Sequence, residues 1–345
     1  MHIVLPFAKD GLEFIAPRHT IEGQVNVSHV VFSRKRGMTR TRVALFGGQD
    51  LGYVMADYFS RRDDLELFVV SYESRRDVVN GYRSALTICK ERNLPFIETA
   101  RPYEDTHAAL RQWQPDIMVG AYYARLFPPE LLKIPRLGAI NAHPGKFPRY
   151  RGPMPTPWYI LNGEKTFGMG IFQIDEGIDT GPVFVEREYP IPDDETGHGL
   201  LRRTMTAAAE LYIENFDRIV RGELIATPQQ GEPLFCPRIE PRYQIDWRGA
   251  RETIMRRIRV HAKPYFPAYS YLFNRMLSVN GAYCDPAQGA PNTRHGEIVQ
   301  TWEDGRISIA CGDGNLIVQD YDVFPSLSKE EWRLHFQVGT RLGSP

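Results

Sequence analysis

Residues 138–152 read GAINAHPGKFPRYRG, an apolar run that ends in Asn141 and His143 and continues into a loop rich in proline and glycine. Side chains two positions apart on a strand point to the same face, so Asn141 and His143 are predicted to project together. Ligands bind beyond the carboxyl ends of the strands in open α/β sheets. The loop at 144–152 is therefore predicted to wall a cleft beside this pair, although a structural histidine and a turn asparagine would fit the same residues.

The pattern around this run predicts an α/β fold. Apolar strand-like runs alternate with helix-like stretches, which is typical of parallel strands joined by helical crossovers. The expected strands are 42–47, 66–72, 116–122 and 138–143, and the expected helices are 51–60, 80–92 and 104–113. A longer helix is predicted over 199–221, with Gly222 at its carboxyl end.

The last third of the chain has a different pattern. Residues 223–242 are rich in proline and polar residues and are predicted to form a linker. A helix at 248–260 and a helix opened by Ser328 and Glu331 as a capping box flank the remaining segments. Short strand-like runs between them predict a small β-barrel or sandwich, at 268–283, 296–302, 306–311 and 315–321.

Composition narrows the function classes. The 345 residues contain 42 Lys and Arg against 42 Asp and Glu, so net charge offers no general attraction to nucleic acid or anionic lipid. No apolar stretch reaches the ~20 residues of a membrane span. The four cysteines lie far apart without metal-ligand spacing, which indicates reduced thiols in a cytoplasmic protein. Residues 1–37 are interpreted as an upstream extension, because Met38 opens the first strand-like segment.

Two further stretches carry candidate chemistry. The turn FQIDEGIDTGPVF at 172–184 holds Asp175, Glu176 and Asp179. It is either a solvated acidic turn or the source of a carboxylate that orients His143 and favours its protonated form. No metal is predicted, because no second histidine lies at ligand spacing. FGGQDLG at 46–52 lacks a dinucleotide or phosphate-loop pattern, so its glycines are interpreted as a tight strand-to-helix turn.

Together these motifs resemble the folate-dependent N-formyltransferase family. The family pattern is Asn-x-His, a proline-containing loop with Arg-Gly, and then Asp-x-Gly before the next strand. HAKPYFPAYSYL at 261–272 is similar to the segment that opens the family's small OB-like domain. The likeness extends from about residue 42 to the end. The positions that match in order are Asn141, His143, Pro148, Tyr150, Arg151, Gly152, Asp175, Gly177, Asp179, Thr180 and Gly181.

The resemblance implies a Rossmann-like catalytic domain with a mostly parallel sheet at 38–222, the linker at 223–242, and an OB-like β-barrel domain with a terminal helix at 243–345. It implies N10-formyltetrahydrofolate as co-substrate and Asn141, His143 and Asp179 as catalytic residues. The implied folate-binding residues are Tyr123, Arg125, Leu126, Ile174, Asp175, Gly177 and Ile178. The implied acceptor-binding residues are Tyr150, Arg151, Gly152 and Pro153. Gly145 and Lys146 depart from the family's His-x-Ser-Leu-Leu-Pro, which affects the loop more than the three catalytic residue types.

The acceptor amine stays open between several classes. A nucleotide-linked amino sugar is favoured, and the chain is most similar to enzymes acting on UDP-4-amino-4-deoxyarabinose, which are often dimers. Methionyl-tRNA is the second candidate, because the enzymes that formylate it resemble this chain in having the same two domains. Those enzymes carry a basic insertion after the second strand. The corresponding stretch here, SYESRRDVVNGYRSALTICKERNLPF at 71–96, is short and lacks that basic run. Neutral net charge also fits nucleic acid poorly. Hydroxyornithine as acceptor, formyltetrahydrofolate hydrolysis and simple folate binding are further alternatives.

Overall fold

The structure is a computed structural model that describes residues 40–72, 81–99, 102–286 and 294–343. The predicted extension at 1–37 lies outside the described residues. Two compact units divide the chain. One comprises residues up to Pro153 with Gly168–Glu188 and Thr204–Phe235, and the other comprises Met154–Phe167, Tyr189–Arg203 and everything from Cys236 on. The second unit therefore takes in two short stretches of the predicted first domain, and the predicted domain boundaries remain a prediction.

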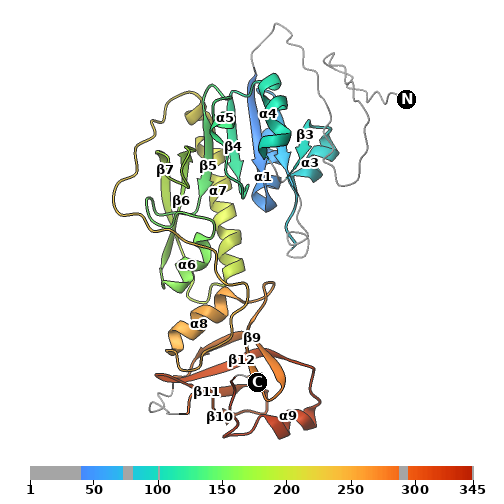
Figure 1. The fold of residues 1–345 in the computed structure, drawn as a ribbon, viewed down its shortest axis with the longest axis vertical. Coiled ribbons are helices and arrows are strands. Elements are labelled where there is room, and N and C mark those ends of the chain that lie inside the picture. Colours follow the sequence, from blue (N-terminus) through green and yellow to red (C-terminus); the bar gives the residue numbers. More distant parts are fainter. Residues whose placement is uncertain (1–39, 73–80, 100–101, 287–293, 344–345) are drawn as a thin grey trace, which may run out of the picture. The chain divides into compact units, whose positions relative to one another are not determined.

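The larger sheet has the predicted α/β architecture (Figure 1). In the described part of the chain it has seven strands in the order β3-β2-β1-β4-β5-β6-β7. The strands β1 to β5 pair in parallel, and β6 runs antiparallel to β5. Their bounds are β1 (Thr41–Gly47), β2 (Leu65–Ser71), β3 (Phe96–Glu98), β4 (Ile117–Ala121), β5 (Ala139–His143), β6 (Thr166–Gln173) and β7 (Val183–Pro190).

Helices cover both faces of this sheet, and Figure 1 shows α4 and α7 on opposite sides of it. Phe46 of β1 and Trp113 of α4 belong to one buried cluster, while Phe59 of α1 packs against Phe216 of α7 with ring centroids 4.8 Å apart. Burial of these apolar faces holds the layers together. The helices in this part of the chain are α1 (Gln49–Ser60), α3 (Ala85–Arg92), α4 (Pro102–Trp113), α5 (Pro129–Leu132) and α7 (Gly197–Val220). The intervening helix α6 (Pro155–Leu161) belongs to the second unit.

Local signals set several helix ends. The helix expected from residue 80 begins only at Ala85, because the Ser84 side chain accepts a hydrogen bond from the Leu86 N–H and caps it. Gly222 ends α7 as predicted, with φ at +70°. Gly52 follows β1 so closely that a Cβ there would lie 2.8 Å from the Gly47 Cα. The glycines at 46–52 thus permit a tight strand-to-helix turn, as the sequence indicated.

Strand order also determines where a ligand site can form. β1 has β2 on one side and β4 on the other, so the chain reverses direction across the sheet between β1 and β4. Such a switch point leaves a crevice at the carboxyl ends of the strands. The Gly48 N–H at the end of β1 donates to the Ala121 carbonyl at the end of β4. β5 is the next strand, and its carboxyl end is His143.

The second unit contains an antiparallel sheet in the order β10-β11-β12-β9-β8. The carboxyl-terminal residues bridge its two outer strands, because Gly343 pairs with Tyr271 of β8 while Arg341 pairs with Glu297 beside β10. This closure gives the predicted OB-like barrel around a buried apolar core. The elements are α8 (Arg251–Val260), β8 (Ala268–Leu272), β9 (Arg275–Cys284), β10 (Ile298–Thr301), β11 (Ile307–Cys311), β12 (Gly314–Phe324) and α9 (Lys329–His335).

Three further features of the described residues bear on the sequence predictions. Ser328 and Glu331 form the predicted capping box at the start of α9. The cysteines at 89, 236, 284 and 311 are all free thiols. Among the helices that the structure describes, none has the length and apolar character required to cross a bilayer.

Candidate active site

Asn141 and His143 lie on β5 at the carboxyl edge of the larger sheet, as predicted. Asn141 pairs with Gly120 of β4, and the absence of a side chain at Gly120 makes room for it. A Cβ at Gly120 would lie only 2.6 Å from Asn141 Oδ1. The Asn141 amide is therefore packed directly over the end of β4. His143 follows two positions later and is buried, with 6% of its surface exposed.

Both ring nitrogens of His143 face an oxygen. Nε2 lies 2.7 Å from the Tyr150 carbonyl oxygen. A carbonyl only accepts hydrogen bonds, so Nε2 carries the proton and donates it. Nδ1 lies 3.5 Å from Asp179 Oδ2. That separation is an ion-pair distance longer than a good hydrogen bond.

Aromatic rings surround the imidazole. Phe147 lies in the loop after β5 and Phe172 lies on β6, with ring centroids 5.9 Å and 6.4 Å from that of His143. Gly145 is also in close contact, since a Cβ there would lie 2.9 Å from His143 Cδ2. The position at which this chain departs from the family's serine is therefore packed against the ring. This apolar environment keeps water from one side of His143 and strengthens its electrostatic contact with Asp179.

Asp179 is held by the loop between β6 and β7. Its backbone adopts a left-handed conformation with φ at +53°, and its Oδ2 accepts a hydrogen bond of 2.8 Å from the Gly152 N–H. Asp175 has a different role, because its Oδ1 accepts hydrogen bonds from the Gly177 N–H and the Thr180 hydroxyl. Asp175 thus closes the turn, and Asp179 is the carboxylate that the turn presents to His143.

The predicted folate residues divide into two groups. The Tyr123 hydroxyl donates to the Thr99 carbonyl at 3.0 Å, and burial raises the pKa of this hydroxyl well above its ordinary value. Ile174 packs against the core of the larger sheet. Leu126 and Ile178 are instead exposed apolar side chains, at 67% and 42%. These two exposed side chains are the ones available for an apolar ring system.

Arg125 and Gly177 complete that set. The Arg125 guanidinium is exposed and lies over the Tyr72 ring, 5.4 Å from its centroid. Gly177 is exposed and has no room for a side chain, because a Cβ there would lie 2.0 Å from Thr180 Oγ1. Gly177 therefore contributes backbone rather than side-chain contacts.

The predicted acceptor residues differ from expectation in what their side chains do. Tyr150 is fully buried, and its carbonyl rather than an exposed phenol acts at the site. The Arg151 guanidinium is bonded to Gln229, and the Gly152 N–H is bonded to Asp179. Pro153 is the exposed member of the four. Residues 150–152 therefore form the support of His143 and Asp179.

Gln229 is a site residue that the sequence did not single out. It lies in the stretch predicted as a linker, yet its Nε2 donates to the carbonyls of Asp179 and Gly181. A glutamine in a proline-rich stretch carries no pattern that points to such a contact. Its pairing with a loop 50 residues away in the chain is visible only in three dimensions.

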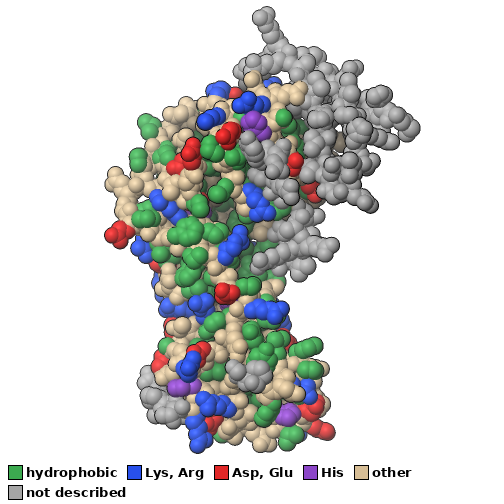
Figure 2. All heavy atoms as spheres, viewed as in Figure 1, with side chains coloured by type: hydrophobic (Ala, Val, Ile, Leu, Met, Phe, Trp, Pro, Cys, Tyr) green, Lys and Arg blue, Asp and Glu red, His purple; other side chains and the backbone are tan. Residues whose placement is uncertain are grey.

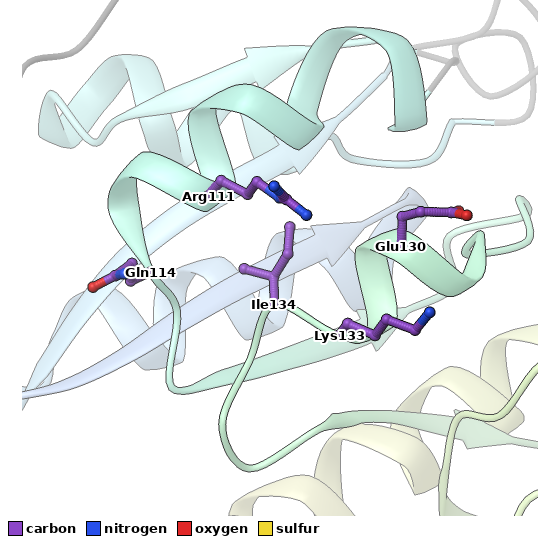
Figure 3. A pocket seen from close by; sticks show the side chains of 5 residues that line it. All are labelled: Arg111, Gln114, Glu130, Lys133 and Ile134. Atoms are coloured by element: carbon purple, nitrogen blue, oxygen red, sulfur yellow. The ribbon is translucent and has the colours of Figure 1, made fainter.

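A surface hollow lies away from His143 on the same unit, between the end of α4 and α5 (Figure 3). Arg111 and Lys133 bring positive charge to it, and Glu130 brings negative charge. The figure shows the Arg111 side chain on α4 and those of Glu130 and Lys133 at α5. None of the described site residues around His143 lines it. Its lining residues are Arg111, Gln114, Glu130, Lys133 and Ile134.

Family models match most of the two regions described above. The model described as formyl transferase matches residues 83–216. The model described as formyl transferase, C-terminal domain, matches residues 239–323. The first match includes β3 to β7 of the larger sheet, and the second includes β8 to β11 and nearly all of β12.

Curated relatives span most of the chain. One, named methionyl-tRNA formyltransferase from Citrifermentans bemidjiense, is 33% identical over 237 residues, which is 68% of this chain and 72% of the relative. Another of the same name, from Thermus thermophilus, is 31% identical over 316 residues, which is 88% of this chain and 99% of the relative. The chain therefore belongs to the formyltransferase family, and it is a formyl-transferring enzyme.

Solved structures share the fold at lower identity. WlaRD, a sugar 3N-formyl transferase solved with dTDP and 5-N-formyl-THF, gives a TM-score of 0.64 at 16% identity, covering 84% of this chain and 100% of that one. An N-formyltransferase from Helicobacter canadensis, solved with folinic acid and dTDP-3-aminofucose, gives a TM-score of 0.63 at 18% identity, covering 81% and 99%. These similarities confirm the predicted fold class.

Proposed function

We propose that the protein transfers a formyl group from N10-formyltetrahydrofolate to the primary amine of a nucleotide-linked amino sugar. The observation that carries the proposal is the Asp179 carboxylate 3.5 Å from Nδ1 of a buried His143, with Asn141 on the same face of the same strand. These residues supply an amide N–H donor, an imidazole and a carboxylate. Direct acyl transfer needs those three groups and no enzyme nucleophile.

The reaction balances with these side chains alone. The uncharged amine attacks the formyl carbon, and the carbonyl oxygen becomes an oxyanion that the Asn141 amide N–H stabilises. The bond between the formyl carbon and N10 of the folate then breaks. The attacking nitrogen loses one proton and N10 gains one. His143 Nδ1 and Asp179 carry that proton between them, since Nε2 is already committed to the Tyr150 carbonyl.

Folate as the donor is supported by the exposed apolar side chains near the site and by the relatives. Leu126 and Ile178 present apolar surface to solvent, which suits one face of a pterin ring. Two of the structural neighbours were solved with 5-N-formyl-THF or folinic acid. Backbone groups of the 122–127 and 174–178 segments are proposed to supply the polar contacts.

An amino sugar as the acceptor is supported by charge and by the neighbours with sugar-nucleotide ligands. Lys and Arg equal Asp and Glu in the chain, and Figure 2 shows basic and acidic side chains interspersed over the face drawn. A broad basic surface usually supplies much of the affinity for nucleic acid. A small anionic acceptor needs only local cations.

Methionyl-tRNA is the second candidate, because the curated relatives at 30–33% identity carry that name. Hydroxyornithine as acceptor, formyltetrahydrofolate hydrolysis, a homodimer and a cytoplasmic location remain predictions. One screen separates the acceptors. Purified protein and N10-formyltetrahydrofolate are incubated with UDP-4-amino-4-deoxyarabinose, dTDP-3-aminofucose, methionyl-tRNA or hydroxyornithine, and products are weighed by mass spectrometry. Formylation of an amino sugar supports the proposal, whereas formylation of methionyl-tRNA alone, or folate turnover without an acceptor, refutes it.

A further inference from the structure

Gln229 joins the loop that follows His143 to the loop that carries Asp179. Its Nε2 donates to the Asp179 carbonyl at 2.9 Å and to the Gly181 carbonyl at 2.7 Å. Its Oε1 accepts from Nε and Nη2 of Arg151 at 3.0 and 2.5 Å. We propose that Gln229 is a positioning residue for formyl transfer, acting through Asp179. This inference rests on the proposed function only for its kinetic consequence.

The partners leave only one orientation for the amide. Main-chain carbonyls accept hydrogen bonds and never donate them, while a guanidinium donates and never accepts. The NH2 group of Gln229 must therefore face Asp179 and Gly181, and its oxygen must face Arg151. Both amide hydrogens are used and the oxygen accepts two bonds, so the side chain is fully satisfied. Glutamate at this position would retain the contact with Arg151 but lose both donors.

Asp179 needs such support because its backbone is strained. A residue with a Cβ at φ of +53° costs free energy that the surrounding structure must offset. The turn has little freedom on its far side, because a Cβ at Gly181 would lie 1.7 Å from the Gln173 carbonyl oxygen. Gln229 binds the carbonyls on both sides of Thr180, which stabilises the conformation that aims Oδ2 at His143.

The chain delivers Gln229 to this place by pairing on both sides of it. Thr227 exchanges two backbone hydrogen bonds with Val183 of β7, at 2.8 and 2.9 Å. Leu234 accepts a hydrogen bond of 2.9 Å from the Arg151 N–H. Both contacts lie within one compact unit. Backbone hydrogen bonds thus hold this part of the predicted linker in place and bring Gln229 into contact with the Asp179 loop.

The kinetic test is a double-mutant cycle with a matched control. The variants are Gln229→Ala, Gln229→Glu, Asp179→Asn, the double variant Gln229→Ala with Asp179→Asn, and Gln230→Ala, whose exposed glutamine is the next residue in the chain. The acceptor is UDP-4-amino-4-deoxyarabinose or dTDP-3-aminofucose, whichever the wild-type protein formylates. Gln229→Ala and Gln229→Glu are expected to lower kcat about 10- to 100-fold with KM for the folate nearly unchanged, because both variants lose the two hydrogen bonds to the Asp179 and Gly181 carbonyls.

The double variant tests whether Gln229 acts through Asp179. In the Asp179→Asn background, Gln229→Ala is expected to lower kcat less than about twofold, because the carboxylate it positions is already gone. Gln230→Ala is expected to behave as the wild type. Equal losses in both backgrounds would overturn the proposal, as would wild-type kcat in Gln229→Glu.

Hydrogen exchange provides a readout without substrate. The Gly152 N–H donates to Asp179 Oδ2, so its exchange reports whether the two loops stay joined. Exchange of the 150–153 segment is expected to accelerate at least about tenfold in Gln229→Ala and not in Gln230→Ala. Unchanged exchange in Gln229→Ala would contradict the positioning role even if the wild-type protein formylated no acceptor tested. Failure of the screen alone would instead count against the proposed function.

Discussion

Asp179 and His143 face each other across the edge of the larger sheet, with Oδ2 of the carboxylate 3.5 Å from Nδ1 of the imidazole. Neither side chain is placed by its own strand or turn alone. His143 is held through Nε2 by the Tyr150 carbonyl, and Asp179 is held by the Gly152 N–H. The loop after β5 thus fixes both members of the pair.

Replacing Asp179 by asparagine removes the charge while retaining an oxygen for the Gly152 N–H. We expect kcat to fall about 10²- to 10⁴-fold, the usual range for loss of proton-transfer catalysis, with a much smaller change in KM. Steady-state kinetics with saturating folate measures this. Glu176→Gln is the control, since Glu176 is an exposed carboxylate of the same turn. Equal losses in the two variants would show that the turn's general charge matters rather than Asp179.

Gly120→Ala should lower activity by displacing the side chain of Asn141. The new Cβ would lie 2.6 Å from Asn141 Oδ1, so the asparagine must move away from the position of the oxyanion. We expect a loss in kcat of about 10²-fold, approaching that of Asn141→Ala, because each removes one oxyanion donor. Gly343→Ala is the control, because no heavy atom lies within 4 Å of its added Cβ. Normal kcat in Gly120→Ala would separate Asn141 from the chemistry.

The exposed apolar side chains near the site should contribute to donor binding. Leu126→Ser and Ile178→Ser are expected to raise KM for N10-formyltetrahydrofolate about tenfold and to change kcat less than twofold, because each removes part of one apolar contact. Ile225→Ser is the matched control, because it makes the same kind of aliphatic-to-serine change at a side chain that is 85% exposed. A rise in KM in the control as large as in the site variants would argue against a folate contact.

Acid should destabilise the second unit through His261. Burial, with a smaller contribution from the Arg257 charge, lowers the pKa of His261 to about 4. Its side chain is 3% exposed. An unfolded histidine has a pKa near 6.5, so between about pH 6.5 and 4 this histidine is protonated in the unfolded chain but not in the folded chain. Stability is therefore lost as pH falls through that window, by up to about 3 kcal/mol.

A comparison of unfolding free energies at pH 7.5 and pH 4.5 tests this dependence. His261→Phe preserves the stacking on Tyr243, whose ring centroid lies 5.8 Å away, and cannot be protonated. We expect its free energy of unfolding to fall less on acidification than that of the wild type. The same fall in both proteins would assign the acid sensitivity to other groups.

The features that the sequence predicted correctly follow local rules. Asn141 and His143 share a face because strand side chains alternate, and Gly222 and Ser328 mark helix ends through their own backbone or side-chain chemistry. Parallel pairing of β1, β4 and β5 follows from the alternation of strands and helices. Such signals lie within a few residues of the feature they specify.

The features that the sequence missed depend on contacts between distant segments. Tyr150 resembles an exposed binding residue in a polar loop, yet its ring is fully buried and its carbonyl holds His143. Gln229 lies in a proline-rich stretch with the composition of a linker, but pairing of that stretch with β7 and Arg151 brings it to Asp179. No periodicity or propensity encodes such pairings.

Transfer of an isotopically labelled formyl group would test the proposed reaction at its reacting carbon. N10-formyltetrahydrofolate with a carbon-13 formyl carbon is mixed with the protein and either UDP-4-amino-4-deoxyarabinose or dTDP-3-aminofucose, and the product is read by NMR. We predict a labelled formamide on the sugar nitrogen with the wild-type protein, and a rate at least about 10²-fold lower with Asp179→Asn. Absence of label on either sugar, or label transferred equally well by Asp179→Asn, would contradict the proposed reaction.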